Sequence, residues 1–271
     1  MNRFTYERHI PVKRFGQNFL KNKTIINTII QKMHLKTIDS VIEIGPGLGA
    51  LTFPICNIVE KITVLEIDEN IIFLLLKSKY YKHVKMILTD VIKFDFHYFF
   101  SLNTSILYRL IGNLPYNIAT CLLINLIQYN VYIFDMHFMF QKEVAHRLLA
   151  IPGNKKYGKL SVLAQYFYKI IPVLDVDRYN FFPAPKVDSV FLRFIPYNKF
   201  NQNKINRYFF ALEQITRMAF QHRRKFLINN LSKLFSEKTL LKFNINPFLR
   251  AEDVSIHQYY LLAKNFLKLY V

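Results

Sequence analysis

Cysteine is scarce in this chain. Only Cys56 and Cys121 occur among its 271 residues, and neither has a neighbour at the spacing of a paired metal ligand. Two such isolated cysteines exclude a dense disulfide framework and a cysteine-based zinc site, and they suit a reducing compartment. We therefore expect a cytoplasmic protein that binds no metal.

Long hydrophobic runs are also lacking. Hydrophobic residues make up 52% of the chain, yet no uninterrupted apolar run reaches the roughly 18 residues of a membrane span. The first residues include Arg3, Arg8 and Lys13 and no apolar h-region, so we expect neither a secretory signal nor an extended transit peptide. We expect no membrane contact, and the length suits one core of about 200 residues plus a small domain.

Acidic residues are few, and the basic excess is terminal. The chain has 37 Lys and Arg against 18 Asp and Glu, a net charge of +19. Residues 1–36 hold eight basic residues against one acid, residues 199–271 hold thirteen against four, and the centre holds sixteen against thirteen. For any single lysine, solubility is the better explanation. Two basic ends around a nearly balanced centre nevertheless predict contacts with nucleic-acid phosphates.

One basic cluster stands out within the C-terminal excess. Arg223, Arg224 and Lys225 follow one another between Phe220 and Phe226, in a segment that we expect to be helical. These three side chains are our candidates for contacts to an RNA backbone.

Glycine is rare as well, and three of the seven glycines are Gly45, Gly47 and Gly49. They follow an apolar run that starts at Val41, a pattern that predicts a strand, a glycine loop and the start of a helix. Such a loop lets the backbone approach a bound nucleoside, with helix N–H groups nearby. The pattern alone suits NAD as well as S-adenosylmethionine (SAM).

Two acids follow at the ends of the next strands that we expect. Glu66 lies near the end of the strand predicted for residues 62–67 and suits the ribose hydroxyls of a bound nucleoside. Asp90 follows the strand predicted for residues 84–88, where it could accept from the donor's adenine amino group. Taken singly, each of these acids is also explained as an ordinary solvated loop residue. In series with the glycine loop, they predict a ligand crevice at the carboxyl ends of a parallel sheet.

A fourth strand predicted for residues 106–112 ends in Asn113, Leu114, Pro115 and Tyr116. The side-chain oxygen of Asn113 and the backbone carbonyl of Leu114 can both accept from the amine of a flat base. Pro115 fixes φ, and Tyr116 offers an aromatic face for stacking. An ordinary Asn-x-Pro turn with a half-buried tyrosine explains the pentapeptide as well, and such turns are common. Together with the donor crevice, the stretch favours methyl transfer to adenine N6.

The order of elements predicts an α/β fold, with a doubly wound, Rossmann-like methyltransferase sheet and a small C-terminal all-α domain. We expect residues 1–199 to form the SAM-binding catalytic domain with its basic N-terminal arm, and residues 200–271 to form a helical RNA-binding domain. Helices are predicted for residues 24–35, 50–58, 69–77, 118–129 and 142–150. Further strands are predicted for residues 132–141, 170–176 and 189–196.

Several longer blocks of the chain are typical of one family. They are KRFGQNFL from Lys13, EIGPGLG from Glu43, NLPYNI from Asn113, QKEVA from Gln141, YGKLSV from Tyr157, FFPAPKVDSV from Phe181, AFQHRRK from Ala219 and RAEDVSIHQY from Arg250. With these blocks the chain resembles the small-subunit ribosomal RNA adenine dimethyltransferases nearly from end to end. Phe182 beside Phe181, and Lys159 where that family usually has Arg, are small departures outside the proposed chemistry.

The resemblance implies transfer of two methyl groups from SAM to N6 of each of two adjacent adenosines near the 3′ end of 16S rRNA. The partner it implies is the small (30S) ribosomal subunit, and we expect a monomer. Phe181 would sandwich the target base against Tyr116. The donor would be held by residues at the positions of the family's motifs. These are Gln17, Asn18, Leu20, Gly45, Gly47, Glu66, Ile67, Asp90, Val91 and Asn113.

Two alternatives share much of this pattern. A 23S rRNA adenine methyltransferase would have the same sheet motifs, but the blocks from Tyr157, Phe181 and Arg250 point away from it. A non-catalytic ribosome-assembly factor would keep the fold and the charge, but it has no need for a donor pocket that includes Glu66 and Asn113.

Overall fold

The computed structural model describes residues 9–197 and 201–270. The part of the basic arm that holds Arg3 and Arg8 lies outside the described residues, as do residues 198–200, where we expect the domain boundary. The chain divides into two compact units. The first comprises Met1–Asn125, Val131–Lys142 and Ile171–Pro196, and the second comprises Leu126–Asn130, Glu143–Ile170 and Tyr197–Val271.

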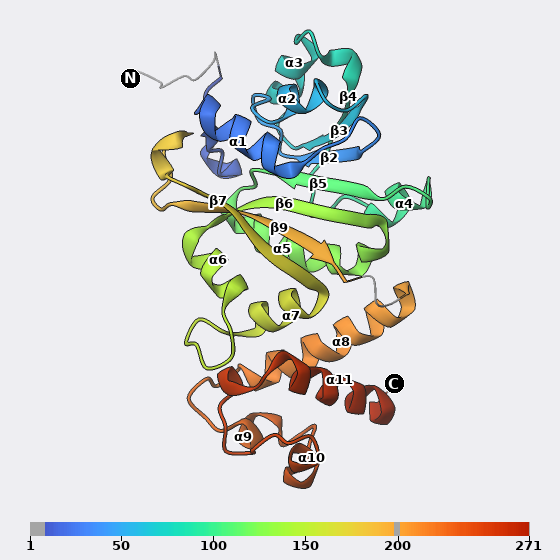
Figure 1. Ribbon diagram of the computed structural model, residues 1–271, viewed down its shortest axis with the longest axis vertical. Helices are drawn as coiled ribbons and strands as arrows, with labels where there is room; N and C mark the ends of the chain where they lie inside the picture. Colours follow the sequence, from blue (N-terminus) through green and yellow to red (C-terminus); the bar gives the residue numbers. More distant parts are fainter. Residues whose placement is uncertain (1–8, 198–200, 271) are drawn as a thin grey trace. The chain divides into compact units, whose positions relative to one another are not determined.

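A seven-stranded sheet runs through the first unit, in the order β4-β3-β2-β5-β6-β9-β7 (Figure 1). Its strands are β2 (Ser40–Ile44), β3 (Ile62–Glu66), β4 (Val84–Leu88), β5 (Tyr108–Gly112), β6 (Ile133–Gln141), β7 (Tyr168–Val176) and β9 (Ser189–Pro196). The strands from β4 to β6 pair in parallel, and β9 pairs antiparallel with β6. The strand order reverses between β2 and β5, which places a ligand crevice at their carboxyl ends.

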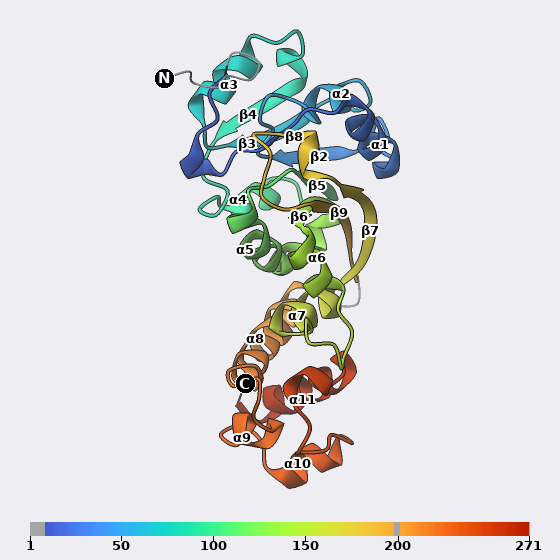
Figure 2. The ribbon, with the colours of Figure 1, turned by 90° about the vertical axis from the view of Figure 1, so that its left-hand side faces the viewer.

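Helices cover both faces of this sheet. They are α1 (Lys23–Met33), α2 (Thr52–Cys56), α3 (Glu69–Leu76), α4 (Phe96–Ser101) and α5 (Tyr116–Leu126). In Figure 2, α1 and α2 lie on one side of the sheet and α4 and α5 on the other. The side chain of Asn22 accepts from the first N–H groups of α1, and Asp68 caps α3 in the same way, because both side chains satisfy donors that a helix start leaves unpaired. This arrangement confirms the doubly wound sheet.

A buried cluster of hydrogen-bonded charged side chains attaches α1 to the sheet. The guanidinium of Arg109 donates to both oxygens of Asp135 on the neighbouring strand, at 2.8 and 2.9 Å, and to the carbonyl of Met33 at 2.7 Å. Arg193 donates to the same carboxylate at 2.9 Å. The buried charges are therefore paired, and the bond to Met33 satisfies a carbonyl at the end of α1.

A second, two-stranded sheet lies beside the first. It pairs β1 (Phe19–Leu20) with β8 (Phe181–Phe182), Phe19 opposite Phe182 and Leu20 opposite Phe181. Two segments that are far apart in the sequence are thereby joined, and the N-terminal segment is held beside the carboxyl ends of the main strands.

The second unit is helical apart from the start of β7. Its helices are α6 (Lys142–Leu149), α7 (Lys159–Phe167), α8 (Gln202–Ala219), α9 (Leu227–Leu231), α10 (Glu237–Lys242) and α11 (Ile256–Tyr270). Rings from three helices meet in its core. Tyr166 of α7, Tyr208 of α8 and Tyr260 of α11 have centroids 5.5–6.2 Å apart. The C-terminal all-α region is as predicted, while residues 126–130 and 143–170, which we expect in the catalytic domain, group with it.

The predicted elements agree closely with the observed ones. β4 and β9 have the predicted bounds, and the other predicted strands and helices are present with shifts at their ends. α4 and α7 were not predicted. No helix in the described ranges is long and apolar enough to cross a membrane.

Candidate active site

The carboxyl ends of β2, β3, β4 and β5 open into one cavity of about 650 Å³. The structure brings most of the predicted site residues to its wall. Those that line it are Gln17, Asn18, Leu20, Gly45, Gly47, Glu66, Ile67, Asp90, Val91, Asn113, Leu114 and Pro115. Their convergence follows from the topology, because the ends of parallel strands meet at the same edge of a sheet. Their roles in binding stay predictions.

The glycine loop after β2 needs its glycines for conformation and for space. Gly47 and Gly49 have φ values of +53° and +84°, a region that side chains disfavour. A Cβ at Gly49 would lie 2.4 Å from the ring of Phe53, and one at Gly47 would lie 3.0 Å from the ring of Phe19. The loop therefore packs closely against its surroundings and leaves its backbone at the cavity wall.

Glu66 ends β3 with its carboxylate held at the wall. Its Oε1 accepts from the backbone N–H groups of Ile67 at 2.8 Å and Asp68 at 2.9 Å. Burial raises the pKa of Glu66, although these backbone bonds oppose the rise. A carboxylate fixed in this way is suited to accept from the hydroxyls of a sugar.

Asp90 lies in the loop after β4. Its Oδ1 accepts from the backbone N–H of Ile92 at 3.0 Å, so the side chain closes a short turn at the cavity wall. A carboxylate at this position can also accept from an amino group.

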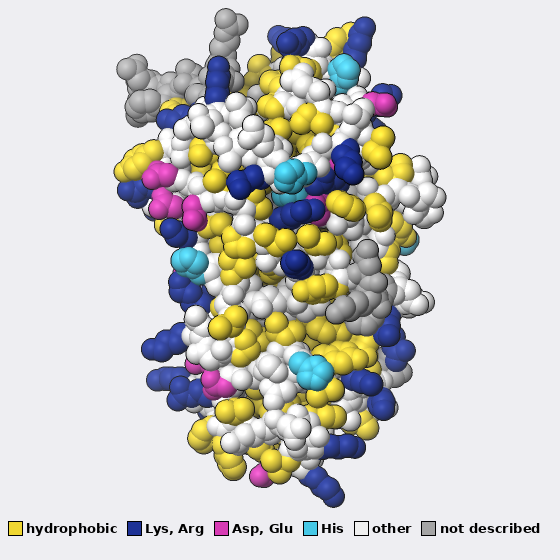
Figure 3. Space-filling view, in the orientation of Figure 1, with side chains coloured by type: hydrophobic (Ala, Val, Ile, Leu, Met, Phe, Trp, Pro, Cys, Tyr) yellow, Lys and Arg dark blue, Asp and Glu magenta, His cyan; other side chains and the backbone are white. Residues whose placement is uncertain are grey.

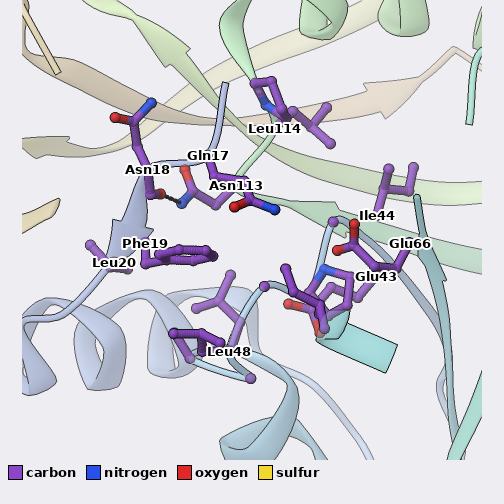
Figure 4. A pocket seen from close by; sticks show the side chains of 18 of the residues that line it. Gln17, Asn18, Phe19, Leu20, Glu43, Ile44, Leu48, Glu66, Asn113 and Leu114 are labelled. Atoms are coloured by element: carbon purple, nitrogen blue, oxygen red, sulfur yellow. Dashed lines mark hydrogen bonds between the residues drawn. The ribbon is translucent and has the colours of Figure 1, made fainter. Parts of the chain in front are cut away.

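A hydrogen bond to Asn18 determines the orientation of the Asn113 side-chain amide. Its Nδ2 donates to the backbone carbonyl of Asn18 at 2.8 Å, the bond drawn in Figure 4. Because a carbonyl only accepts, the amide nitrogen must face Asn18, and Oδ1 is left as an acceptor. In Figure 4, Asn113 lies on the Asn18 side of the cavity and Glu66 on the other side.

The end of β5 also approaches β2 very closely. A Cβ on Gly112 would lie 2.8 Å from the carbonyl oxygen of Ile44 and 2.7 Å from the Leu114 side chain. Leu114 is 2% exposed and directly follows Asn113 in the sequence.

Gln17 lines the cavity, but its amide is engaged elsewhere. Nε2 donates to Asp68 at 2.8 Å, and Oε1 accepts from the backbone N–H of Val12 at 2.8 Å. The ring of His9 lies 3.2 Å from the same Oε1. Gln17 therefore ties the N-terminal segment to the start of α3, close to Glu66.

Tyr116 and Phe181 do not line this cavity. The half-buried Tyr116 forms a hydrogen bond of 2.7 Å between its hydroxyl and that of Ser189. Phe181 is 1% exposed and belongs to the core, whereas Phe182, which alternates with it on β8, is partly exposed. In this conformation Phe181 offers no open face to a base, so the predicted sandwich stays a prediction.

The basic cluster is not helical, contrary to our expectation. Arg223, Arg224 and Lys225 lie in the connection between α8 and α9. α8 ends at Ala219, and the amide of Asn230 donates to the carbonyls of Ala219 and His222, which satisfies one of the carbonyls that the helix end leaves unpaired.

Within this cluster the three cations differ. Arg223 donates to Glu252 at 2.9 Å and to the carbonyl of Tyr157 at 3.1 Å, so it links the connection after α8 to two other segments of the second unit. All three side chains are exposed, so Arg223 differs from Arg224 and Lys225 only in these bonds within the protein. Lys and Arg side chains far outnumber acids on the face of the protein that Figure 3 shows.

One residue at the site was missed by the sequence analysis. Glu43, on β2, lines the cavity and is 1% exposed, and its Oε2 has no hydrogen-bond partner among the described residues. Burial raises the pKa of Glu43 to about 7, and the nearby Glu66 adds to the rise. The sequence feature that could have identified Glu43 as a site residue is an acid inside the apolar run of a buried strand.

These features fit a nucleoside-based methyl donor. The cavity is large enough for a ligand of that size, the glycine loop presents backbone, and Glu66 and Asp90 supply acceptors for hydroxyl and amino groups. Within the described ranges, no group of three or more His, Cys, Asp or Glu residues is placed to hold a metal ion.

Comparisons with known proteins agree with this chemistry. Residues 11–268 match the family model described as ribosomal RNA adenine dimethylase. The ribosomal RNA small subunit methyltransferase A of Buchnera aphidicola subsp. Schizaphis graminum (strain Sg) is 44% identical over 272 residues, which cover 97% of this chain and 96% of the relative.

Two solved structures are similar over most of the chain. A dimethyladenosine transferase from Plasmodium falciparum has 25% identity and a TM-score of 0.78, covering 92% of this chain and 98% of that one. The 23S rRNA methyltransferase ErmE has 22% identity and a TM-score of 0.67, covering 92% and 99%, and this likeness shows the fold alone. The chain therefore belongs to the ribosomal RNA adenine dimethylase family and is an enzyme that dimethylates adenine in ribosomal RNA with SAM as the donor.

Proposed function

We propose that this enzyme transfers two methyl groups to N6 of each of two adjacent adenosines near the 3′ end of 16S rRNA. The substrate is the small (30S) ribosomal subunit, the enzyme acts as a monomer, and the reaction takes place in the cytoplasm. The single observation that carries the proposal is the fixed orientation of Asn113, whose Oδ1 is left as an acceptor at the wall of the donor cavity.

Acceptors at this position answer the main difficulty of the reaction. The lone pair of adenine N6 is delocalised into the ring, so the nitrogen is a poor nucleophile until its geometry becomes tetrahedral. In the first transfer, Asn113 Oδ1 and the backbone carbonyl of Leu114 accept from the two N–H bonds of the amine. In the second transfer a single N–H remains, and one of the two acceptors receives it. These bonds strengthen as the nitrogen gains positive charge during methyl transfer, so they stabilise the transition state more than the bound substrate.

No general base is required in this scheme. When bound, SAM would supply a methyl group that its sulfonium already activates, and the methylated amine would then lose its proton to solvent. The amide of Asn113 is neutral and cannot take that proton. Tyr116 does not take it either, because its hydroxyl is bonded to Ser189 and burial raises its pKa. Tyr116 therefore serves as a stacking surface.

The remaining cavity residues hold the donor. Glu66 accepts from the ribose hydroxyls, and Asp90 accepts from the amino group of the donor's adenine. Gly45 and Gly47 would hold the methionine part of the donor, and Asn18 would cover it from the N-terminal segment. Leu20, Ile67 and Val91 complete the apolar wall.

The rRNA is held by the basic cluster in the connection between α8 and α9. Arg224 and Lys225 contact the phosphate backbone, while Arg223 keeps the turn in place through Glu252. We assign the catalytic role to residues 1–199 and the RNA-binding role to residues 200–271. The net charge of +19 supports an electrostatic contribution to this binding.

The proposed substrate is tested by asking which ribosomal particle accepts label. Purified enzyme with methyl-labelled SAM is incubated with small and large subunits from a strain that lacks the modification. The proposal predicts label in the small subunit only. Label in the large subunit would move the enzyme to the 23S rRNA class, and binding without label would favour a non-catalytic assembly factor.

A further inference from the structure

The hydroxyl groups of Tyr116 and Ser189 join two segments that lie 73 residues apart in the sequence. Their oxygens are 2.7 Å apart, in the range of a good O–H···O hydrogen bond. Tyr116 is the first residue of α5 and follows Asn113, Leu114 and Pro115, which line the donor cavity. Tyr116 is therefore close in sequence to the proposed amine acceptors Asn113 and Leu114. Its hydroxyl, at the far end of the ring, is held by a distant part of the chain.

Ser189 provides a rigid anchor. It is 0% exposed, begins β9 and lies opposite Gln141 of β6 in the antiparallel register. The preceding residue, Asp188, is fixed as well. Its backbone carbonyl accepts from the N–H of Lys142, and its side-chain Oδ1 accepts from the N–H of Arg178. The serine hydroxyl thus projects from backbone that has little freedom to move.

We propose that Ser189 is a positioning residue for methyl transfer, whose hydroxyl holds the Tyr116 ring in the orientation that receives the target adenine. The inference rests on the proposed function, in which this ring stacks on the base.

The physical reason is the freedom of a tyrosine side chain. Rotation about χ1 moves a half-buried ring between rotamers, and the bond to Ser189 holds the ring in one of them. With Cα fixed by the start of α5 and the hydroxyl fixed by Ser189, both ends of the ring axis are held. A base that stacks on this ring then meets the acceptors of Asn113 and Leu114 without a search, and a misplacement of about 1 Å at such a site is costly.

The test compares Ser189→Ala, Tyr116→Phe and the double variant. Each single change removes one partner of the bond and keeps the aromatic ring. We expect each to lower kcat/KM for small subunits by about 3- to 10-fold, the range for one hydrogen bond. The double variant should lose no more than either single variant, because the same bond is removed. SAM affinity, measured by calorimetry, should be unchanged, because neither side chain lines the donor cavity.

Ser161→Ala is the matched control. Ser161 is also 0% exposed and donates to the carbonyl of Arg147, but it belongs to the second unit and does not line the cavity. Its loss should lower the melting temperature and leave kcat/KM unchanged. Wild-type kcat/KM in Ser189→Ala would overturn the inference, as would additive losses in the double variant. If Ser189→Ala does not fold, wild-type kcat/KM in Tyr116→Phe overturns it as well. No label transfer by the wild-type enzyme would instead refute the proposed function.

Discussion

Glu43 offers a quantitative prediction about stability. Its carboxyl is 1% exposed, and its pKa is raised from an ordinary 4.5 to about 7. The cause is burial in the cavity wall, to which the neighbouring Glu66 adds. The folded protein therefore retains the Glu43 proton over a pH range in which the unfolded chain has already released it.

The sign of the effect follows from that difference in proton binding. Below pH 4.5 both states are protonated, and Glu43 contributes nothing to the pH dependence. Between pH 4.5 and 7 the folded state binds more protons than the unfolded state, so the free energy of unfolding falls as the pH rises. Each pH unit in this range lowers it by about 1.4 kcal/mol, so the loss above pH 7 is about 3 kcal/mol.

Replacing Glu43 by glutamine removes this loss, because an amide of nearly the same shape does not ionise. Urea unfolding, followed by circular dichroism, is compared for the wild type and Glu43→Gln at pH 5 and pH 8 without SAM. The stability advantage of the variant should grow by about 2–3 kcal/mol between the two pH values. An advantage that is the same at both would show that Glu43 ionises normally and would refute the reasoning.

Three further predictions concern the site and the RNA surface. Asn113→Ala should lower kcat by about 100-fold, while SAM affinity by calorimetry changes only a few-fold; equal losses would assign Asn113 to donor binding. Leu114→Pro should stop the reaction at one methyl group, because the rigid rim keeps the monomethylated amine from rebinding with its methyl turned aside, and undiminished dimethyladenosine by mass spectrometry would contradict this. Reversing the charges of Arg224 and Lys225 should weaken small-subunit binding and reduce its salt slope by about one per residue. An unchanged slope in filter binding would remove both from the interface.

The sheet and most of the cavity could be predicted because their signals are local. Buried parallel strands read as apolar runs, and in a parallel sheet the residue after each run falls at the same edge. The sequence positions of Gly45, Glu66, Asp90 and Asn113 are therefore sufficient to predict that all four line one cavity, as they do.

The contacts that orient the site could not be predicted in this way. The bonds from Asn113 to Asn18, from Gln17 to Asp68 and from Tyr116 to Ser189 join residues 51–95 positions apart. No periodicity encodes such pairs. Phe181 likewise is buried and pairs with the distant Leu20, and sequence patterns show neither the burial nor the pairing.

The central claim is dimethylation of two adjacent adenosines, and mapping the product tests it most directly. Small subunits from a strain that lacks the modification are incubated with enzyme and SAM, and the 16S rRNA is digested and analysed by mass spectrometry. We expect N6,N6-dimethyladenosine at two adjacent positions near the 3′ end, formed about 100-fold more slowly with Asn113→Ala. Methylation elsewhere in the rRNA, or modification that stops at one methyl group, would contradict it.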